Sequence, residues 1–433
     1  MKSLKMWIGA VAVLTLLIFL ALLQLLWSSR IETTQHGVHV RLLIPTGTKA
    51  VIGVPTYAGT GDAPVLPRFL DGPVVRREAD KQWRASWFCE DRVYHRHGRT
   101  ATLEIDCAGQ RSSYPIQSQA PLAPAVFAQP ARMLILSDIE GNARFLDAAL
   151  RELGVMNQDG RWTYGAGHLV IAGDAVDRGR EVFAVLWRLY ALSIDAAQAG
   201  GAVHLVLGNH EQYLLQGNPS RAHREHLHAL ERLGGQMAAF APDTILGHWL
   251  RQQPVLIQAG DILVTHGGIS PEVAASGLGV AQLNDAMRRY WRGEKASTSE
   301  LEAVIGLAGL SQYRGYFESK KDLYAKAGND DLASILGRYD ARAVVVGHTA
   351  VERIETLYEG RVHAVNVNSD TAASEALLFE HGNARTVSLA SQRGLAKESR
   401  HSRPLHLTRG DDWHTLGRLL QSGYQLAQLP FPY

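Results

Sequence analysis

The chain has 433 residues, of which 46% are hydrophobic and 20% are charged, and it contains 41 glycines and 16 prolines. This composition is that of a globular protein, and it excludes a collagen-like, coiled-coil or mainly disordered chain. The 44 Lys and Arg residues nearly balance the 42 Asp and Glu residues, which leaves a formal net charge of +2. Because the net charge is so small, the protein has no strong positive field to attract a polyanion, and we expect no nucleic-acid partner.

An apolar run lies close to the amino terminus. Residues 7–27 read WIGAVAVLTLLIFLALLQLLW and carry no formal charge, and about 20 apolar residues span a bilayer as a helix. Lys2 and Lys5 precede the run and Arg30 follows it, a bias that favours a cytoplasmic segment at 1–6. We therefore expect a single-pass anchor in the inner (plasma) membrane and a periplasmic, extracytoplasmic body. A cleaved signal peptide is the alternative, although no A-x-A site follows the run.

The next segment, residues 31–118, alternates short apolar stretches with Gly, Pro and Asp, which predicts a small β-rich domain. It holds the two cysteines of the chain, Cys89 and Cys107. In an oxidising compartment these form either a structural disulfide or a pair of unpaired thiols, and the sequence leaves both open. Three prolines within Ala120–Pro130 indicate that residues 119–131 are a linker.

Residues 132–395 show short β-type runs that alternate with helical spacing, a pattern typical of an α/β domain with a largely buried sheet. The helical spacing that follows the first run stops at Gly154. Residues 396–433 form an appended tail. The β-type runs are Met133–Leu136, Leu169–Ala172, Val203–Leu207, Ile262–Thr265, Ala343–Val346 and Val362–Val367.

Polar clusters follow five of these runs. In open α/β sheets, ligands bind in the crevice outside the carboxyl ends of the strands. Each cluster alone is an ordinary turn after a strand, but together they predict one site that gathers Asp, Glu, Asn and His side chains. The clusters are SDIEGN at 137–142, GDAVDRG at 173–179, GNHE at 208–211, HGG at 266–268 and GHT at 347–349.

This ordered set resembles the calcineurin-like metallophosphoesterase superfamily. It is most similar to the phosphoprotein phosphatase branch, including its bacterial Shewanella-like members, whose general pattern is GDxHG, GDxVDRG, GNHE, HGG and GH. The similar stretch covers about residues 132–390. The resemblance implies a β-sandwich flanked by helices, with a two-metal centre that hydrolyses phosphomonoesters by direct attack of a metal-bridging hydroxide.

The resemblance also implies a role for each motif residue. His210 would protonate the leaving oxygen and Asp177 would orient its imidazole, while Arg178 would hold two phosphate oxygens. Glu211 is expected beside the site rather than as a ligand. The metal ligands would be Asp138, Glu140, Asp174, Asn209, His266 and His348, with Asp174 bridging the two ions.

Two further residues are singled out by the same comparison. Arg314 lies in a Tyr-Arg-Gly-Tyr stretch similar to the Shewanella-like branch, which predicts a second phosphate clamp; an exposed arginine in a helical lid is the alternative. Glu140 stands where the pattern places histidine. Either the site is damaged, or Asp138, Glu140 and Asp174 give the first ion an all-carboxylate set that favours a hard ion. We expect two divalent ions, Mn²⁺ first, with Mg²⁺, Fe or Zn²⁺ as alternatives.

Three functions follow from these motifs. The first is a membrane-anchored phosphatase whose partner is a phosphorylated protein or small molecule. The second is a dinucleoside polyphosphate or nucleotide hydrolase that uses the same site, since one fold hosts both activities. The third is a non-catalytic envelope protein that binds phosphorylated ligands. His223, His226 and His228 lie in a charged helical stretch and are expected on the surface.

Overall fold

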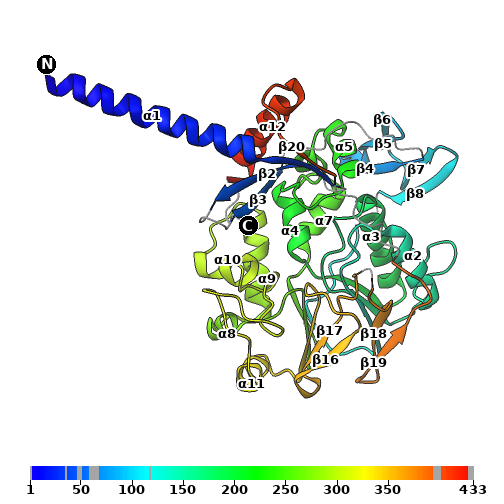
Figure 1. The fold of residues 1–433 in the computed structure, drawn as a ribbon. Coiled ribbons are helices and arrows are strands. Elements are labelled where there is room, and N and C mark those ends of the chain that lie inside the picture. The colour runs from blue at the N-terminus through cyan, green and yellow to red at the C-terminus, as the bar shows by residue number, and fades with distance from the viewer. Residues whose placement is uncertain are drawn as a thin grey trace. The chain divides into compact units, whose positions relative to one another are not determined.

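The computed structural model describes residues 2–34, 37–45, 51–57, 68–116, 119–369, 371–393 and 401–427. The chain divides into two compact units (Figure 1): residues 64–396 form the larger unit, and residues 1–63 with 397–433 form the smaller one. Residues 394–395 of the predicted catalytic domain, and residues 396–400 and 428–433 of the predicted tail, lie outside the described residues.

The smaller unit contains a four-stranded sheet in the order β20-β1-β2-β3. Strand β20 pairs antiparallel with β1, so the predicted tail completes the sheet that follows the apolar run. Ile31 and Val40 pack with Leu405 and Leu416 in a small apolar cluster. The elements are α1 (Lys2–Ser28), β1 (Arg30–Thr34), β2 (Gly37–Pro45), β3 (Val51–Tyr57), β20 (His401–Pro404) and α12 (Gly410–Ala427).

The apolar run of residues 7–27 lies within α1. Several of its large apolar side chains are more than half exposed, among them Leu14, Leu16 and Phe19. Among the residues that the structure describes, we find no helix with both the length and the apolar character that crossing a membrane requires.

Residues 31–118 do not form a single β-rich domain, contrary to the expectation from the sequence. The first strands pair with the tail, whereas β4 contacts helices α3 (Val182–Gln198), α5 (Arg224–Arg232) and α7 (Ile245–Gln252) of the larger unit. A disulfide between Cys89 and Cys107 joins the ends of β5 and β7. The strands are β4 (Leu70–Arg77), β5 (Trp83–Cys89), β6 (Arg92–Gly98), β7 (Thr102–Cys107) and β8 (Gln110–Pro115).

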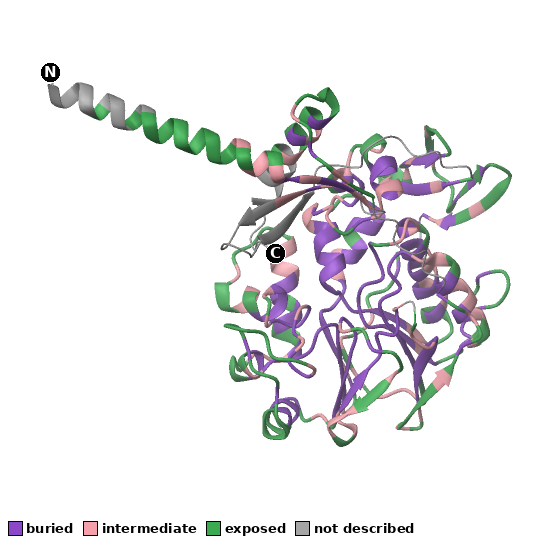
Figure 2. Ribbon diagram, viewed as in Figure 1, coloured by how far each residue is buried: buried purple, intermediate pink, exposed green. Residues whose placement is uncertain are grey.

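Two mixed sheets form the core of the larger unit. One has the order β12-β11-β10-β18-β19, and the other has the order β16-β17-β15-β14-β13-β9. Ile135 and Val170 of the first sheet share one fully buried apolar cluster with Val264 and Val345 of the second. Figure 2 shows much of the ribbon in this region in purple, the colour of buried residues. The sheets therefore pack face to face as a sandwich, and the predicted mixed α/β fold is confirmed for this unit.

The strands of the sandwich are short. They are β9 (Val126–Phe127), β10 (Arg132–Leu136), β11 (His168–Ile171), β12 (Ala202–Leu205), β13 (Leu256–Ala259), β14 (Ile262–Thr265), β15 (Ala343–Val346), β16 (Glu355–Leu357), β17 (Val362–Ala364), β18 (Glu375–Glu380) and β19 (Asn383–Ser388). The predicted linker at 119–131 contributes β9, which pairs with β13 and so extends the second sheet.

Helices cover both outer faces of the sandwich, since α3 packs against β12 and α9 packs against β13 (Figure 1). Helix α2 ends one residue before Leu153, close to the predicted stop at Gly154, and its first turn is capped by Asn142, whose side chain accepts a hydrogen bond from Phe145 N. The other helices are α2 (Ala143–Glu152), α4 (Asn209–Gln216), α6 (Gln236–Ala239), α8 (Pro271–Ala275), α9 (Val280–Trp291), α10 (Thr298–Ile305) and α11 (Asn329–Arg338).

Parallel pairing sets the position of the polar loops. Strands β10, β11 and β12 run parallel in one sheet, and β14, β15 and β17 run parallel in the other. Their residues are apolar along most of their length because both faces are covered. Since the carboxyl ends of parallel strands meet at one edge of a sheet, the loops that follow them open toward a common region.

Candidate metal centre

Six strand-end loops bring polar side chains together at this edge. The five loops predicted from the sequence are joined by a sixth, which follows β17. The side chains that these loops supply are Asp138 after β10, Asp174 after β11, Asn209 after β12, His266 after β14, His348 after β15 and Asn366 after β17. All six are buried.

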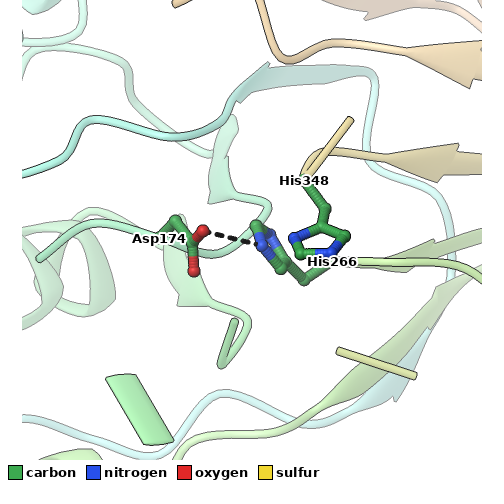
Figure 3. Close-up of side chains that lie close together, drawn as sticks. All are labelled: Asp174, His266 and His348. Carbon is green, nitrogen blue, oxygen red and sulfur yellow. Dashed lines mark ion pairs between the residues drawn. The ribbon is translucent and has the colours of Figure 1, made fainter. Parts of the chain in front are cut away.

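Asp174, His266 and His348 form the tightest group of potential metal ligands (Figure 3). One ligand atom from each lies within 4.8 Å of the other two. His266 Nε2 is 2.9 Å from Asp174 Oδ2 and 3.2 Å from Asn209 Oδ1. His266 Nδ1 lies 2.8 Å from the carbonyl oxygen of Ala172. A proton on Nδ1 donates to this carbonyl and leaves Nε2 as the ligand atom.

Asp138 lies at the junction of three loops. Its Oδ1 accepts a 2.9 Å hydrogen bond from Asn366 Nδ2. Its Oδ2 accepts from Ser137 Oγ at 2.5 Å and from His348 N at 3.2 Å. The carboxylate is thereby fixed next to the loop that carries His348, at the place predicted for a ligand of the first ion.

Glu140, which was predicted as a ligand of the first ion, pairs with the predicted phosphate clamp Arg178. Its carboxylate is 3% exposed, and Oε1 lies 3.0 Å from Nη1 of Arg178. Within the described part of the chain, Glu140 is outside the group whose ligand atoms lie close together. The structure therefore brings this carboxylate to the predicted phosphate clamp rather than to the ligands of the closest group.

His210 and Asp177 lie in the arrangement expected of an acid and its orienting group. His210 Nδ1 is 3.1 Å from Asp177 Oδ2, and both side chains are buried. His210 Nε2 points toward the centre, 3.8 Å from Asp174 Oδ2. A carboxylate at Nδ1 holds the proton there in the neutral ring, so that Nε2 is the atom that takes up or gives a proton at the site.

Glu211 is buried beside the centre and does not face it. Its two carboxylate oxygens accept four main-chain N–H groups, those of Gly208, Asp174, Ala175 and Val176, at 2.7 to 3.2 Å. Glu211 therefore ties the GNHE loop to the GDAVDRG loop, in the place beside the site that the sequence indicated.

The main chain at the centre is strained. Asp138, Asp174 and His348 adopt left-handed conformations, with φ of 51°, 52° and 61°, which cost free energy for residues other than glycine and cluster at functional sites. Two motif glycines leave room for them. A Cβ at Gly208 would lie 2.2 Å from Asp174 Oδ1, and one at Gly347 would lie 2.1 Å from Ser137 Oγ.

Burial and mutual charge shift the pKa values of the buried acids in opposite directions. Burial raises the pKa of Asp138 against the charge of His266. It raises the pKa of Glu140 to about 7 although Arg178 opposes the shift. Burial also acts to raise the pKa of Asp174, but the charges of His266 and His210 outweigh it and hold this pKa below its usual value. Asp174 is thus the acid most firmly ionised.

The pKa values of the three histidines at the centre are also shifted in opposite directions. Burial lowers the pKa of His266, but Asp174 overcomes the effect and raises it to about 9. The pKa of His210 is raised because Asp174 and Asp177 together outweigh burial. Burial and the charge of His266 hold the pKa of His348 well below its usual value. A neutral imidazole and an ionised carboxylate are the forms that bind divalent metals.

Two arginines reach the rim of the centre. The side chain of Arg178 is 46% exposed although it is paired with Glu140. Arg314 is half-buried, and its Nη1 donates to the carbonyl oxygen of His348 at 3.1 Å and to Thr349 Oγ1 at 3.4 Å. Arg314 therefore lies against a ligand loop, where a phosphate clamp is predicted, and not on an exposed lid.

Sequence reasoning missed two residues of the centre. Asn366 lies inside the predicted β-type run at Val362–Val367, but β17 ends at Ala364, so the rule that polar side chains follow strands finds Asn366 only once the end of the strand is known. Arg393 carries no such signal. Its buried guanidinium donates to the carbonyl oxygens of Ser137, at 2.9 Å, and of Asp138, and it lies over the ring of Phe145 at 4.6 Å.

The prediction that the three histidines near α5 lie on the surface is wrong for two of them. His226 is fully buried, and its Nδ1 pairs with Asp71 Oδ2 at 2.6 Å. His228 is 6% exposed, and His223 caps α5 by accepting a hydrogen bond from Glu225 N. The His226–Asp71 pair attaches β4 to α5, a contact between segments that are distant in the sequence and that local charge does not reveal.

The donor set at the centre fits a divalent metal. Asp174 offers carboxylate oxygen, His266 and His348 offer imidazole nitrogen, and their ligand atoms converge. These are the donors that Mn²⁺, Fe²⁺ and Zn²⁺ accept in proteins. Asp138 and Asn209 add further oxygen atoms next to them.

Comparison with known proteins agrees with this geometry. A family model described as calcineurin-like phosphoesterase matches residues 131–352. The crystal structure of a cold-active protein-tyrosine phosphatase from a psychrophilic Shewanella species is similar with a TM-score of 0.65 and 30% identity, over 73% of this chain and 99% of the other.

Curated relatives are similar over shorter stretches. The chain is 24% identical to Shewanella-like protein phosphatase 2 of Arabidopsis thaliana, over 41% of this chain and 56% of the relative. It is 33% identical to the symmetrical bis(5'-nucleosyl)-tetraphosphatase of Vibrio cholerae, over 32% of this chain and 45% of the relative. The chain thus spans about half the length of these curated relatives.

Proposed function

This chain belongs to the calcineurin-like phosphoesterase family of metal-dependent enzymes, and we propose that its own activity is the hydrolysis of phosphomonoesters on a protein or a small molecule. The observation that carries the proposal is the buried group of Asp174, His266 and His348 with His210 Nε2 directed at it. A proton donor next to a set of metal ligands is what hydrolysis of a phosphoester needs.

Two divalent ions would share the carboxylate of Asp174. Asn209, His266 and His348 would hold one ion, and Asp138 would hold the other. When bound, the ions supply the Lewis acidity that makes water a nucleophile near neutral pH and that offsets the charge of the phosphoryl group. The predicted preference for Mn²⁺ depends on Glu140 as an added carboxylate ligand. It is tested by comparing turnover with Mn²⁺ and with Zn²⁺, and full activity with Zn²⁺ alone would contradict it.

The remaining residues position the substrate and move a proton. Arg178 and Arg314 lie at the rim and would hold the phosphate oxygens. His210 keeps its Nδ1 on the buried carboxylate of Asp177 and presents Nε2 to the leaving oxygen, which it protonates. A protein that merely binds phosphorylated ligands has no need of this buried acid, so the pair argues against the non-catalytic alternative.

A dinucleoside polyphosphate hydrolase is the second candidate. The observation that favours it is the 33% identity to a relative named bis(5'-nucleosyl)-tetraphosphatase, over 143 residues. Both activities would use the same ligands, and the two candidates differ in the substrate that enters the site.

Parallel assays of the full chain with Mn²⁺ test the proposal. We expect turnover of p-nitrophenyl phosphate and of a phosphotyrosine or phosphoserine peptide, and little turnover of diadenosine tetraphosphate. His210→Asn should lower kcat about 100- to 10,000-fold while the bound metal stays. Faster cleavage of diadenosine tetraphosphate would support the second candidate. Bound metal without turnover in either protein would support the non-catalytic one.

Membrane anchoring and a periplasmic location are also proposals. They rest on the uncharged run at 7–27 and on the exposed apolar side chains of α1, such as Ile18. A disulfide between Cys89 and Cys107 agrees with an oxidising compartment.

A further inference from the structure

Glu140 and Arg178 are brought together by the main chain of two motifs. Glu140 N donates to the carbonyl oxygen of Asp174 at 2.9 Å, and the carbonyl oxygen of Glu140 accepts from Gly179 N at 2.8 Å. A Cβ at position 179 would lie 2.4 Å from that same oxygen, so glycine is required for this approach. The contact between the two side chains is therefore fixed by the backbone on both sides.

The buried carboxylate of Glu140 forms an ion pair with Arg178. It is 3% exposed, and its Oε1 lies 3.0 Å from Arg178 Nη1. Among the described residues no hydrogen bond reaches Oε1, so the ion pair is what balances this buried oxygen. Leaving such a buried charge without a partner is strongly unfavourable, which opposes rotation of Glu140 away from Arg178.

Among the described residues, Glu140 is outside the closest group of potential metal ligands, as Asp138 is, and Glu140 differs from Asp138 in its pairing with Arg178. The ligand atoms that converge within 4.8 Å belong to Asp174, His266 and His348. Arg178, in contrast, keeps 46% of its side chain exposed while one nitrogen faces Glu140. A guanidinium has five N–H groups in a planar fork, so one edge can be held by a carboxylate while the other receives phosphate.

A carboxylate suits this position better than the histidine of the resembling pattern. A neutral imidazole gives a guanidinium no charge to pair with, whereas a carboxylate forms an ion pair with it, here with 3.0 Å between Glu140 Oε1 and Arg178 Nη1. Glutamate in place of histidine at position 140 therefore serves to hold Arg178, although from the sequence alone it resembles damage to a metal site.

We propose that Glu140 is a positioning residue that orients Arg178 for the phosphate group, and that it is not a metal ligand. The proposal rests on the proposed phosphatase function. The proposal predicts a division between two effects. Loss of the Glu140 charge should weaken phosphate binding, and it should leave the metal content unchanged.

Glu140→Gln in the full chain tests this division. We expect the KM for p-nitrophenyl phosphate and the inhibition constant of inorganic phosphate to rise about tenfold because Arg178 loses the ion pair that holds it, with kcat changed less than threefold. Mn²⁺ stoichiometry and affinity, measured by calorimetry and electron paramagnetic resonance, should equal those of the wild type. In an Arg178→Ala background, Glu140→Gln should change KM less than twofold.

Glu181→Gln is the matched control. Glu181 lies on the loop that carries Arg178 but pairs with Arg144, at 3.6 Å, so the KM of the Glu181→Gln variant should equal that of the wild type. Loss of one Mn²⁺ ion, a tenfold weaker Mn²⁺ affinity, or an unchanged KM in Glu140→Gln would overturn the proposal. It would also be overturned if Glu140→Gln raised KM by the same factor in the Arg178→Ala background as in the wild type. If the wild type itself binds no metal and hydrolyses nothing, it is the proposed function that fails.

Discussion

Arg393, a buried residue outside the motifs, supports the main chain at Asp138. Its guanidinium donates to the carbonyl oxygens of Ser137 and Asp138, while Asn142 Nδ2 donates to the carbonyl oxygen of Arg393 at 2.7 Å. The left-handed φ of Asp138 is therefore supported by hydrogen bonds on both sides of the peptide. Strain of this kind persists where the surroundings over-determine it.

Arg393→Met should destabilise the fold at this point. The substitution keeps an apolar side chain over Phe145 but leaves two buried carbonyl groups without donors, at about 1–3 kcal/mol each. We expect the free energy of unfolding in a denaturant titration to fall by about 2–4 kcal/mol. Arg385→Met is the control, since Arg385 is 56% exposed and pairs loosely with Glu380; its change should stay within about 0.5 kcal/mol. A loss below about 1 kcal/mol for Arg393→Met would contradict this account of the loop.

At this scale the sequence predicts residue types better than partners. The motifs located Asp174, Asn209 and His348 because polar residues follow buried strands. They could not show that Glu140 turns toward Arg178, since a side chain has several rotamers and the choice depends on a loop 38 residues away. Arg393 stayed hidden because nothing in its neighbourhood distinguishes it from a surface arginine.

The carboxylate of Glu211 joins helix α4 to one of the loops of the metal centre. Glu211 belongs to the first turn of α4, yet its carboxylate binds main-chain N–H groups of the loop that follows β11. The position of α4 is thereby coupled to the loop that carries Asp174 and Asp177. Four N–H donors on one carboxylate occupy all of its acceptor directions.

Glu211→Gln tests this connection between α4 and the loop that follows β11. An amide group presents N–H to donors that need an acceptor, so we expect a loss of about 2–4 kcal/mol in unfolding free energy and loss of most bound Mn²⁺. Glu225→Gln serves as the control, because Glu225 forms a partly exposed pair with Arg180 worth about 0–1 kcal/mol. Full metal content in Glu211→Gln would show that the two loops hold their positions without this carboxylate.

The elements themselves were predictable where the pattern was local. Buried strands such as β10 and β15 read as continuous apolar runs, and α2 shows both its periodicity and its end. The segment at 31–118 was not predictable, because its strands pair with residue 401 and beyond or pack against α5. Pairing over such distances leaves no local mark, and the burial of His226 against Asp71 is missed for the same reason.

On the scale of the whole molecule, two units are built from interleaved segments. The smaller unit takes its strands from both ends of the chain, and the larger one lies between them in sequence. The polypeptide therefore leaves the first unit, completes the phosphoesterase fold, and returns to finish the sheet with β20. An anchor at residues 7–27 would be attached to the smaller unit.

The proposed anchor predicts where the full chain is found in a fractionated cell. We expect it in the membrane pellet and resistant to alkaline carbonate. Leu16→Arg combined with Leu17→Arg should release it, because each arginine costs about 2.5–3.5 kcal/mol at the centre of a membrane helix. Leu420→Arg, on the exposed face of α12, should have no effect on partitioning. Wild-type chain in the soluble fraction would remove the anchor from the account.

The central claim is that loops from two packed sheets converge to hold a pair of metal ions. The most direct measurement is the anomalous diffraction of a crystal of the full chain soaked in Mn²⁺. We expect two anomalous peaks about 3.5–4 Å apart, with Asp174 between them, His266 and His348 at one and Asp138 at the other. No peak near Asp174, or a single ion held by other residues, would contradict the account.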